Sequence, residues 1–261
     1  MAIRDRFDLV IFDWAGTMVD FGCHAPVIAL REAFALQGVV ISEVQARRDM
    51  GKPKADHVRD LLADPGINRA WTETHGRAPD DEDVRKLMTD LGPLMRDQAA
   101  RAARLIDGAA AAVQALRAEG IKVGSSTGYT REMMGPVLRE AAVQGYVPDH
   151  VVCSGETPAG RPTPLMIYKA CADLGVWPLS RVVKVDDTNV GVAEGRAAGC
   201  FTVGIAASGN GVGLSEEAFL ALPAAERRAR IAGAEKSLLA AGADVVIETV
   251  AQLIAALRSA P

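Results

Sequence analysis

The sequence predicts an α/β protein with a doubly wound parallel sheet and a helical insert after the first strand. From residue 104 onward, helical patterns alternate with short apolar segments that fit buried strands. Residues 21–103 show helical patterns and no convincing strand. Polar residues follow several strand-like segments directly, at the strand ends where parallel sheets form ligand sites. We therefore expect one unit built from residues 1–20 and 104–261, and a helical unit over residues 21–103.

The composition is that of an ordinary globular protein. Of 261 residues, 49% are hydrophobic and 24% are charged, and the net charge of −4 argues against a nucleic-acid partner. No leader-like apolar segment precedes the first strand, and no apolar stretch reaches the roughly 20 residues that span a membrane. We expect a cytoplasmic protein with reduced thiols that binds neither nucleic acid nor membrane. Four cysteines lack the spacing of a metal or redox motif: Cys23, Cys153, Cys171 and Cys200.

The first strand and the insert can be placed from local patterns. Residues 7–12 are mostly apolar, β-branched or aromatic, as in a buried strand, and Gly16 breaks the pattern soon after. Gly51 and Pro53 interrupt the second helical pattern with a turn. Four helical patterns make up the insert: 24–38, 43–63, 67–76 and 80–103.

From residue 104 onward, predicted helices alternate with predicted strands. Glycines end several of the helical patterns, and Thr130 stands where it can cap a helix. Residues 208–213 are rich in glycine and form a loop. The expected helices are 108–119, 130–144, 165–174, 190–198, 215–241 and 249–258. The expected strands are 121–127, 151–153, 182–185, 201–206 and 244–247.

Chemistry-bearing residues follow the predicted strands. Asp13 ends the first strand, and a carboxylate there is costly to bury unless it is paired or bound to a metal. Thr127 and Asp187 lie at the ends of two later strands, and the loop 160–164 carries Arg161. Each residue also has an ordinary interpretation, as a helix or turn cap or as a solvated loop charge. Together they match phosphoryl transfer: a carboxylate nucleophile, a second carboxylate for Mg²⁺, and hydroxyl and guanidinium groups for the phosphoryl oxygens.

These segments resemble the four motifs of the haloacid dehalogenase superfamily: Asp-Trp-Ala-Gly-Thr at 13–17, Ser126-Thr127, Arg161-Pro162-x-Pro164 and Asp186-Asp187. Longer stretches resemble the phosphonatases of that superfamily: Met-Gly-x-x-Lys-x-x-His-Val at 50–58, Thr-Gly-Tyr-Thr-Arg-Glu-Met-Met at 127–134 and Pro-Ala-Gly-Arg-Pro at 158–162. The resemblance covers the whole chain. It implies a Rossmann-like core, with the helical insert as a cap domain, and hydrolysis of the P–C bond of phosphonoacetaldehyde to acetaldehyde and phosphate.

The resemblance also implies a role for individual residues. Asp13 is expected to be the nucleophile and to form an aspartyl-phosphate, and Lys54 to form a Schiff base with the substrate aldehyde. Mg²⁺ is expected to bind Asp13, the backbone carbonyl of Ala15 and Asp187. Thr127 and Arg161 are expected to bind the phosphonyl group.

Three further residues are candidates for substrate contact. His57, one helical turn from Lys54, is expected to position water or relay a proton, and a packed structural role is the alternative. Tyr129 is expected to contact the substrate or the cap, and Met50 to line the cleft between cap and core, and simple packing is equally compatible with both. The same holds for Cys23.

The chemistry of P–C cleavage explains why a lysine is expected. A simple carbanion is a poor leaving group, whereas a protonated imine accepts the electron pair and the carbon leaves as an enamine. The attacking form is the free amine, so the lysine pKa must be lowered by desolvation or a nearby cation. Ala15 stands where phosphatases of the superfamily carry an Asp that acts as acid and base. Its presence disfavours the main alternative, an Mg²⁺-dependent phosphatase or phosphomutase, and leaves the group that activates water undetermined.

Two positions depart from the expected motifs. Met18 replaces a second Thr after the first motif. In the fourth motif, Asp186 stands before the key residue Asp187, where Gly is common, and Gly191 stands where a second Asp is common. Asp186 is a candidate to replace that carboxylate, and the sequence does not decide which of the two aspartates binds the metal.

The resemblance also suggests a homodimer packed through the caps. The insert contains enough Leu and Met, together with Trp71, to offer an apolar surface for this contact. A non-catalytic binding protein on the same fold is a further alternative, which the full set of acidic and basic motif residues disfavours.

Overall fold

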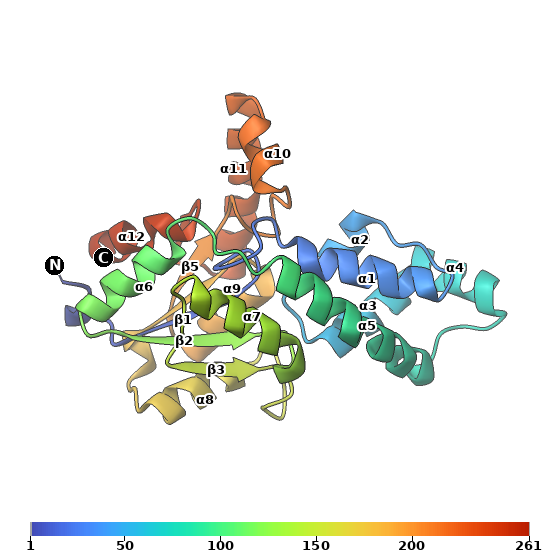
Figure 1. Cartoon of the computed structure of the whole chain (residues 1–261), viewed down its shortest axis with the longest axis horizontal. Helices are drawn as coiled ribbons and strands as arrows, with labels where there is room; N and C mark the ends of the chain where they lie inside the picture. Colours follow the sequence, from blue (N-terminus) through green and yellow to red (C-terminus); the bar gives the residue numbers. More distant parts are fainter. Residues whose placement is uncertain (1, 261) are drawn as a thin grey trace.

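The computed structural model describes residues 2–260 and contains a six-stranded parallel sheet (Figure 1). The strand order is β3-β2-β1-β4-β5-β6, so β1 lies inside the sheet and the chain builds outward from it in both directions. The strands are β1 (Leu9–Phe12), β2 (Lys122–Thr127), β3 (His150–Cys153), β4 (Val182–Asp186), β5 (Phe201–Ile205) and β6 (Val245–Ile247). Every neighbouring pair is parallel. The doubly wound α/β fold predicted from the sequence is therefore confirmed.

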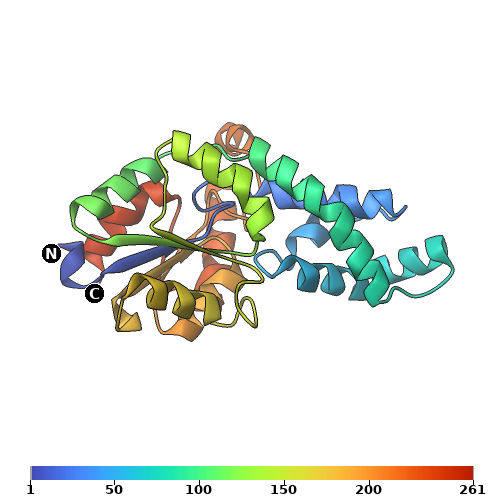
Figure 2. The same cartoon turned by 60° about the horizontal axis from the view of Figure 1, so that its bottom comes forward.

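Helices cover both faces of the sheet, because the strands are apolar on both sides, as β1 illustrates. Its alternate residues point to opposite faces: Val10 and Phe12 pack into one apolar cluster, and Leu9 and Ile11 pack into another. On the first face lie α6 (Ala109–Ala118), α7 (Arg131–Val143) and α12 (Leu253–Ser259), and on the second lie α8 (Leu165–Leu174) and α9 (Asn189–Ala198), as Figure 2 shows. The two ends of the described chain lie at the end of the sheet away from the helices of residues 24–101 (Figure 1).

Five helices gather beyond the other end of the sheet (Figures 1 and 2). They are α1 (His24–Leu36), α2 (Glu43–Arg47), α3 (Lys54–Ala63), α4 (Pro65–His75) and α5 (Asp81–Arg101). In the described chain, no strand of the sheet lies between β1 and β2, as predicted. The long helix α5 packs along α1 and continues against α7. We call α1–α5 the helical region.

Trp71 lies inside the helical region, so its predicted place on a contact surface was wrong. The side chain is fully buried and packs edge-on against Phe34, with ring centroids 6.3 Å apart. Its position in α4, facing α1, explains this: a large aromatic ring is best buried where two helices meet. The exposed apolar side chains of the region are others: Ile28, Leu36, Val40 and Val44.

The interruption predicted within residues 43–63 separates α2 from α3. Ser42 caps α2 by accepting a hydrogen bond from the Gln45 amide. Gly51 adopts a φ of +97°, which favours glycine, and Pro53 occupies the cap position before α3. As a consequence, Lys54 is the first residue of α3.

The remaining elements follow the predicted order with local differences. The first strand begins at Leu9 because residues 3–5 form a 3₁₀ turn. The helical pattern at 215–241 is two helices, α10 (Glu216–Ala221) and α11 (Ala224–Ala241), because Pro223 cannot continue the first helix. Thr130 caps α7 as predicted. None of the helices within residues 2–260 combines the length and the apolar character needed to cross a membrane.

Candidate active site

The candidate site lies at the carboxyl ends of three adjacent strands. Asp13 follows β1 directly, Thr127 is the last residue of β2, and Asp186 is the last residue of β4. Because β2, β1 and β4 are neighbours in a parallel sheet, these ends lie at one edge. All three side chains are buried. The structure thus brings Asp13 to the same sheet edge as two residues that follow it by more than a hundred positions.

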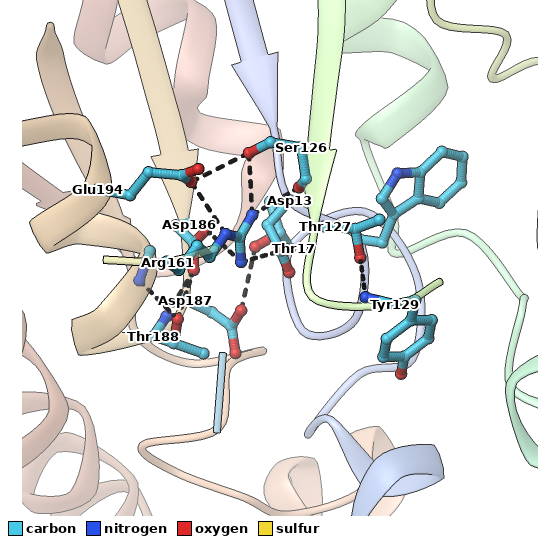
Figure 3. A network of polar contacts seen from close by, with 12 residues as sticks. Asp13, Thr17, Ser126, Thr127, Tyr129, Arg161, Asp186, Asp187, Thr188 and Glu194 are labelled. Carbon is cyan, nitrogen blue, oxygen red and sulfur yellow. Dashed lines mark hydrogen bonds and ion pairs between the residues drawn. The ribbon is translucent and has the colours of Figure 1, made fainter. Parts of the chain in front are cut away.

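Arg161 is the centre of a buried network of polar contacts (Figure 3). It donates through Nη1 to Asp13 Oδ1 at 2.9 Å, and through Nη2 to the carbonyl and hydroxyl oxygens of Ser126 at 2.6 and 3.0 Å. Glu194 Oε2 lies 2.9 Å from Nε, and Asp186 Oδ2 lies 3.4 Å from Nη1. Burial acts to lower the Arg161 pKa, but the three carboxylates outweigh it and raise that pKa above its ordinary value. Arg161 therefore stays charged and fixes Asp13.

A second buried cation, Lys184, belongs to the same network and was not predicted. Its Nζ lies 3.0 Å from Asp186 Oδ2, 3.4 Å from Glu194 Oε2 and 2.9 Å from the Ser126 hydroxyl. The sequence held a signal, because a lysine inside the apolar run 182–185 can be buried only with carboxylate partners. Glu194, on α9, carried no signal of its own, since a glutamate is ordinary in a helix.

Three aspartates form a cluster that is suited to a metal ion. Asp13, Asp186 and Asp187 each offer a carboxylate oxygen within 4.8 Å of the others. Asp187 is held in place by the Thr17 hydroxyl, 3.3 Å from Oδ1, and by the Asn210 amide, 2.7 Å from Oδ2. Buried carboxylate oxygens at this spacing are ligands that a divalent cation such as Mg²⁺ prefers.

The backbone approaches Asp187 closely on two sides. A Cβ on Gly16, whose φ is +80°, would lie 2.3 Å from Asp187 Oδ2, and a Cβ on Gly209 would lie 2.6 Å from Asp187 Cβ. Only glycine allows this approach. Burial, followed by the charges of Asp186 and Asp13, raises the pKa of Asp187 well above its ordinary value. A nearby positive charge would relieve this repulsion.

Asp186 occupies the space that a side chain at position 191 would need. A Cβ on Gly191 would lie 1.9 Å from Asp186 Oδ2. The other oxygen, Oδ1, accepts hydrogen bonds from the Thr188 amide at 3.0 Å and its hydroxyl at 2.7 Å. Burial acts to raise the Asp186 pKa, but Lys184 and Arg161 outweigh it and hold the pKa below its ordinary value. The two departures from the fourth motif are therefore physically linked.

A narrow pocket opens beside Asp13 and contains most of the predicted site residues. It has about 20 Å³ of room for water, which suits a single molecule. Its lining comes from the sheet edge and from the helical region: Asp13, Ala15, Cys23, Pro26, Met50, Gly51, Lys54, Thr127, Gly128, Tyr129, Arg161 and Thr188. Among these, Pro26, Gly51, Gly128 and Thr188 were not predicted as site residues, because no sequence pattern marks a residue that only lines a pocket.

Lys54 enters this pocket from the first turn of α3. Its side chain is 3% exposed, and Nζ lies 3.7 Å from the Met50 sulfur and 5.7 Å from the centre of the Tyr129 ring. Burial lowers the pKa of Lys54 to about 8. The Asp13 charge acts in the opposite direction, while the Arg161 charge adds to the lowering. About a tenth of Lys54 is therefore free amine at pH 7, far more than for a lysine with the ordinary pKa near 10.5.

Tyr129, Thr127 and Cys23 complete the pocket wall. The Tyr129 amide donates to the Thr127 hydroxyl at 3.2 Å, and the Tyr129 hydroxyl has no hydrogen-bond partner within residues 2–260. Cys23 is buried at the start of α1 in a left-handed conformation, with a φ of 54°. Burial raises the thiol pKa well above its ordinary value, so Cys23 stays protonated.

His57 is buried next to the pocket but is not among its lining residues. Neither ring nitrogen has a hydrogen-bond partner of ordinary geometry in the described chain. Burial and the charges of Lys54 and Lys52 lower the His57 pKa to about 2, although the nearby Ala46 backbone acts to raise it. His57 is therefore neutral, with a free donor and a free acceptor.

Comparison with known proteins agrees with this geometry. A family model described as haloacid dehalogenase-like hydrolase matches residues 7–199. A phosphonoacetaldehyde hydrolase of Syntrophobacter fumaroxidans is 48% identical, covering 92% of this chain and 86% of the relative. One from Bacillus cereus is 42% identical, with coverage of 95% and 94%. The crystal structure of a phosphonoacetaldehyde hydrolase-like protein from Oleispira antarctica has a TM-score of 0.95 at 39% identity, covering 98% of this chain and 92% of that one.

The parallel sheet, with Asp13 after its first strand and three aspartates at its edge, is the arrangement of a haloacid dehalogenase-like hydrolase. The chain belongs to that superfamily and, within it, to the phosphonoacetaldehyde hydrolase family.

Proposed function

We propose that this hydrolase cleaves the P–C bond of phosphonoacetaldehyde to give acetaldehyde and phosphate. The observation that carries the proposal is the buried Lys54, which shares one small pocket with Asp13 and Arg161. An amine with a lowered pKa beside a carboxylate nucleophile fits a substrate with an aldehyde at one end and a phosphonyl group at the other. The names of the relatives support this substrate.

The proposed reaction begins at Lys54. Its free amine attacks the aldehyde carbon, water leaves, and a protonated imine forms two bonds from phosphorus. Asp13 then attacks phosphorus through a carboxylate oxygen, the P–C bond breaks, and its electron pair moves into the imine to give an enamine. Protonation of the enamine carbon and hydrolysis of the resulting imine release acetaldehyde and restore Lys54. Water cleaves the aspartyl-phosphate and releases phosphate.

The contacts of Arg161 and Thr127 support their proposed roles. Arg161 Nη1 holds Asp13 Oδ1 at 2.9 Å, which leaves the other carboxylate oxygen of Asp13 for attack. Arg161 and Thr127 both line the pocket, so the positive charge of the guanidinium and the Thr127 hydroxyl can attract the phosphonyl oxygens. Met50 and Tyr129 lie against the amine end, where they offer Lys54 no carboxylate partner, and neutral His57 is buried behind the pocket wall.

The donor set fits a divalent cation. The network contains four buried carboxylates (Asp13, Asp186, Asp187 and Glu194) and two buried cations (Arg161 and Lys184). When all six are charged, the net charge is −2, which one Mg²⁺ neutralises. We propose Asp13, Asp187 and the Ala15 carbonyl as ligands. Asp186 is less suited, because Lys184, Arg161 and Thr188 already occupy its oxygens. Bound Mg²⁺ would screen the phosphonyl charge from Asp13.

Trapping with borohydride tests the proposal. Incubation with phosphonoacetaldehyde and borohydride is expected to reduce the imine and add a stable mass to the peptide that contains Lys54. Lys54→Arg is expected to abolish the adduct and to lower turnover by more than about 1000-fold, the scale seen when a covalent nucleophile is lost. Lys52→Arg is the matched control, because Lys52 is partly exposed and pairs with Asp49 and Asp60. Wild-type turnover by Lys54→Arg would rule out the imine route.

A separate measurement tests the alternative that the protein is a phosphatase or phosphomutase. Ala15 provides no carboxylate to protonate an oxygen leaving group, so activity on p-nitrophenyl phosphate is expected to be far below that on the phosphonate. Equal activity on both would favour a phosphatase or phosphomutase.

We also propose that residues 21–103 form a cap domain on a core of residues 1–20 and 104–261, and that two chains pair through their caps. The exposed apolar residues of the helical region support the pairing. A cytoplasmic location is supported by four buried cysteines that form no disulfide.

A further inference from the structure

The glycine-rich loop 208–213 has no role in the proposed reaction, yet it touches the metal-site carboxylate. The loop follows β5. Its Asn210 amide donates to Asp187 Oδ2 at 2.7 Å, and Gly209 packs against the Asp187 side chain so closely that a Cβ would collide. The position of Asp187 therefore depends on the position of this loop.

Arg47, the last residue of α2, holds the other side of the same loop. Its Nη1 donates to the Asn210 side-chain oxygen at 3.1 Å, and its Nη2 donates to the Gly213 carbonyl at 3.0 Å. Asn210 returns a hydrogen bond from its side-chain amide to the Arg47 carbonyl at 3.1 Å. A Cβ on Gly213 would lie 2.9 Å from the Arg47 guanidinium carbon. Arg47 and Asn210 thus form a reciprocal pair across the boundary between the helical region and the sheet.

Arg47 also binds the segment that leads into α1. Nη1 donates to the carbonyls of Gly22 at 2.8 Å and Cys23 at 3.4 Å, and Nε donates to Glu43 at 2.8 Å. Both Gly22 and Cys23 adopt positive φ, at 88° and 54°. The Arg47 side chain is only 12% exposed. One guanidinium therefore connects α2, the entry to the helical region and the loop beside Asp187.

The pocket between the two parts must open to admit substrate. Its room for water is about 20 Å³, and its walls come from the sheet edge and from α1 and α3. A movement of the helical region away from the sheet would draw Arg47 from Asn210 and Gly213, because those residues belong to the loop that follows β5. Such a movement would break the hydrogen bonds between Arg47 and the loop that this structure shows.

We propose that Arg47 is a positioning residue that couples closure of the helical region to the placement of Asp187. This inference rests on the proposed function for its metal site. In the closed form, Arg47 holds Asn210, and the Asn210 amide holds Asp187 where it can bind the cation. In the open form, the loop loses its support from α2, and Asp187 loses a fixed donor. The cation site is complete only when the helical region has closed.

Calorimetric titration of the full chain with Mg²⁺, without substrate, tests this coupling. Arg47→Met and Asn210→Ala are each expected to weaken Mg²⁺ binding by about tenfold, within the usual range of coupling between two sites. The double variant is expected to have the same Mg²⁺ affinity as the single variant with the lower affinity. Both substitutions break the same connection, the one between Arg47 and Asn210. Arg48→Met is the matched control: Arg48 follows Arg47 and bonds Asp64, and its removal is expected to leave Mg²⁺ binding unchanged.

Several results would overturn the proposal. The first is an Arg47→Met variant that binds Mg²⁺ as tightly as the wild type. The second is a double variant in which the effects of Arg47→Met and Asn210→Ala multiply, as independent effects do. The third is a wild-type chain that binds no Mg²⁺. Arg47→Lys controls for loss of folding, because a lysine keeps the positive charge. Since a lysine donates to fewer partners than an arginine, this variant is expected to have an Mg²⁺ affinity between those of the wild type and Arg47→Met. Since no substrate is present, a chain inactive on phosphonoacetaldehyde still gives a clear result. Failure of the proposed function and failure of the coupling are therefore distinguishable.

Discussion

Lys54 is buried and yet forms no ion pair within residues 2–260. Burying an ammonium without a carboxylate is costly, so the pocket favours the neutral amine. The neighbours within reach are a thioether and an aromatic ring, from Met50 and Tyr129. Such soft groups tolerate the amine in either charge state and leave its lone pair free for an electrophile.

The pKa of Lys54, about 8, sets a pH dependence for imine formation. Below pH 8 the residue is mostly ammonium and cannot attack, and above pH 8 it is mostly amine. The rate of adduct formation under borohydride is therefore expected to rise with pH through about 8 and then to level off. Mass spectrometry of the trapped protein across pH 6 to 10, all in the presence of Mg²⁺, measures this directly. A rate that does not change between about pH 7 and 9 contradicts the assignment.

Protons are expected to compete with Mg²⁺ at the aspartate cluster. Burial and the Asp186 charge raise the pKa of Asp13 to about 6, and burial with the charges of Asp186 and Asp13 raises the pKa of Asp187 well above its ordinary value. Both must lose their protons to bind a cation, so Mg²⁺ affinity is expected to fall as the pH drops below about 6. Calorimetry at pH 5.5 and 7.5 measures the change, and Asp187→Asn is expected to abolish binding at both values. Equal Mg²⁺ affinity at the two pH values would show that Mg²⁺ does not bind at the Asp13 and Asp187 carboxylates.

At the scale of elements, the sequence patterns predicted the order of strands and helices and the edge where the site forms. Those features depend on local periodicity and on turns, such as the one at Gly51 and Pro53, that can be read within a few residues. The pairing of Lys184 with Glu194 could not be predicted, because it depends on how α9 packs against β4. The roles of Asp186 and Asp187 depend on the direction of each side chain, which sequence spacing alone does not fix.

The contact between Asp186 and Gly191 predicts a compensating pair of substitutions. Gly191→Ala is expected to destabilise the protein by about 1–3 kcal/mol, because the new Cβ would overlap the Asp186 carboxylate. The double variant Asp186→Gly with Gly191→Asp is expected to lose less stability than Gly191→Ala. In it the side chain at position 186 is gone, and the new Asp at position 191 supplies a carboxylate in its place. Thermal unfolding measures both. Gly92→Ala is the control, since Gly92 is also helical and has no atom within 4 Å of the added Cβ.

At the scale of the whole molecule, the proposed pairing of two chains through their caps can be tested at an exposed apolar residue. Val40 is 83% exposed and Val44 75% exposed; Val40 lies between α1 and α2, and Val44 lies on α2. Val40→Asp is expected to shift the protein from dimer to monomer, because a charge at the centre of an apolar contact is left unpaired. Light scattering after size-exclusion chromatography measures the mass. Val147→Asp, at an exposed valine of the sheet unit, is expected to leave the dimer intact. A wild-type monomer would refute the pairing.

The location of Lys54 on α3 and of Asp13 after β1 has a mechanical consequence. In the proposed reaction, the substrate is bonded to one part of the molecule through its carbon end and becomes bonded to the other through phosphorus. Before cleavage, the substrate is bonded to Lys54 through the imine, while its phosphonyl end is held at the sheet edge without a covalent bond. Cleavage leaves the carbon fragment on Lys54 as an enamine and the phosphoryl group on Asp13. From that step on, no covalent bond of the substrate connects its two ends, and each part of the molecule carries its own product to hydrolysis.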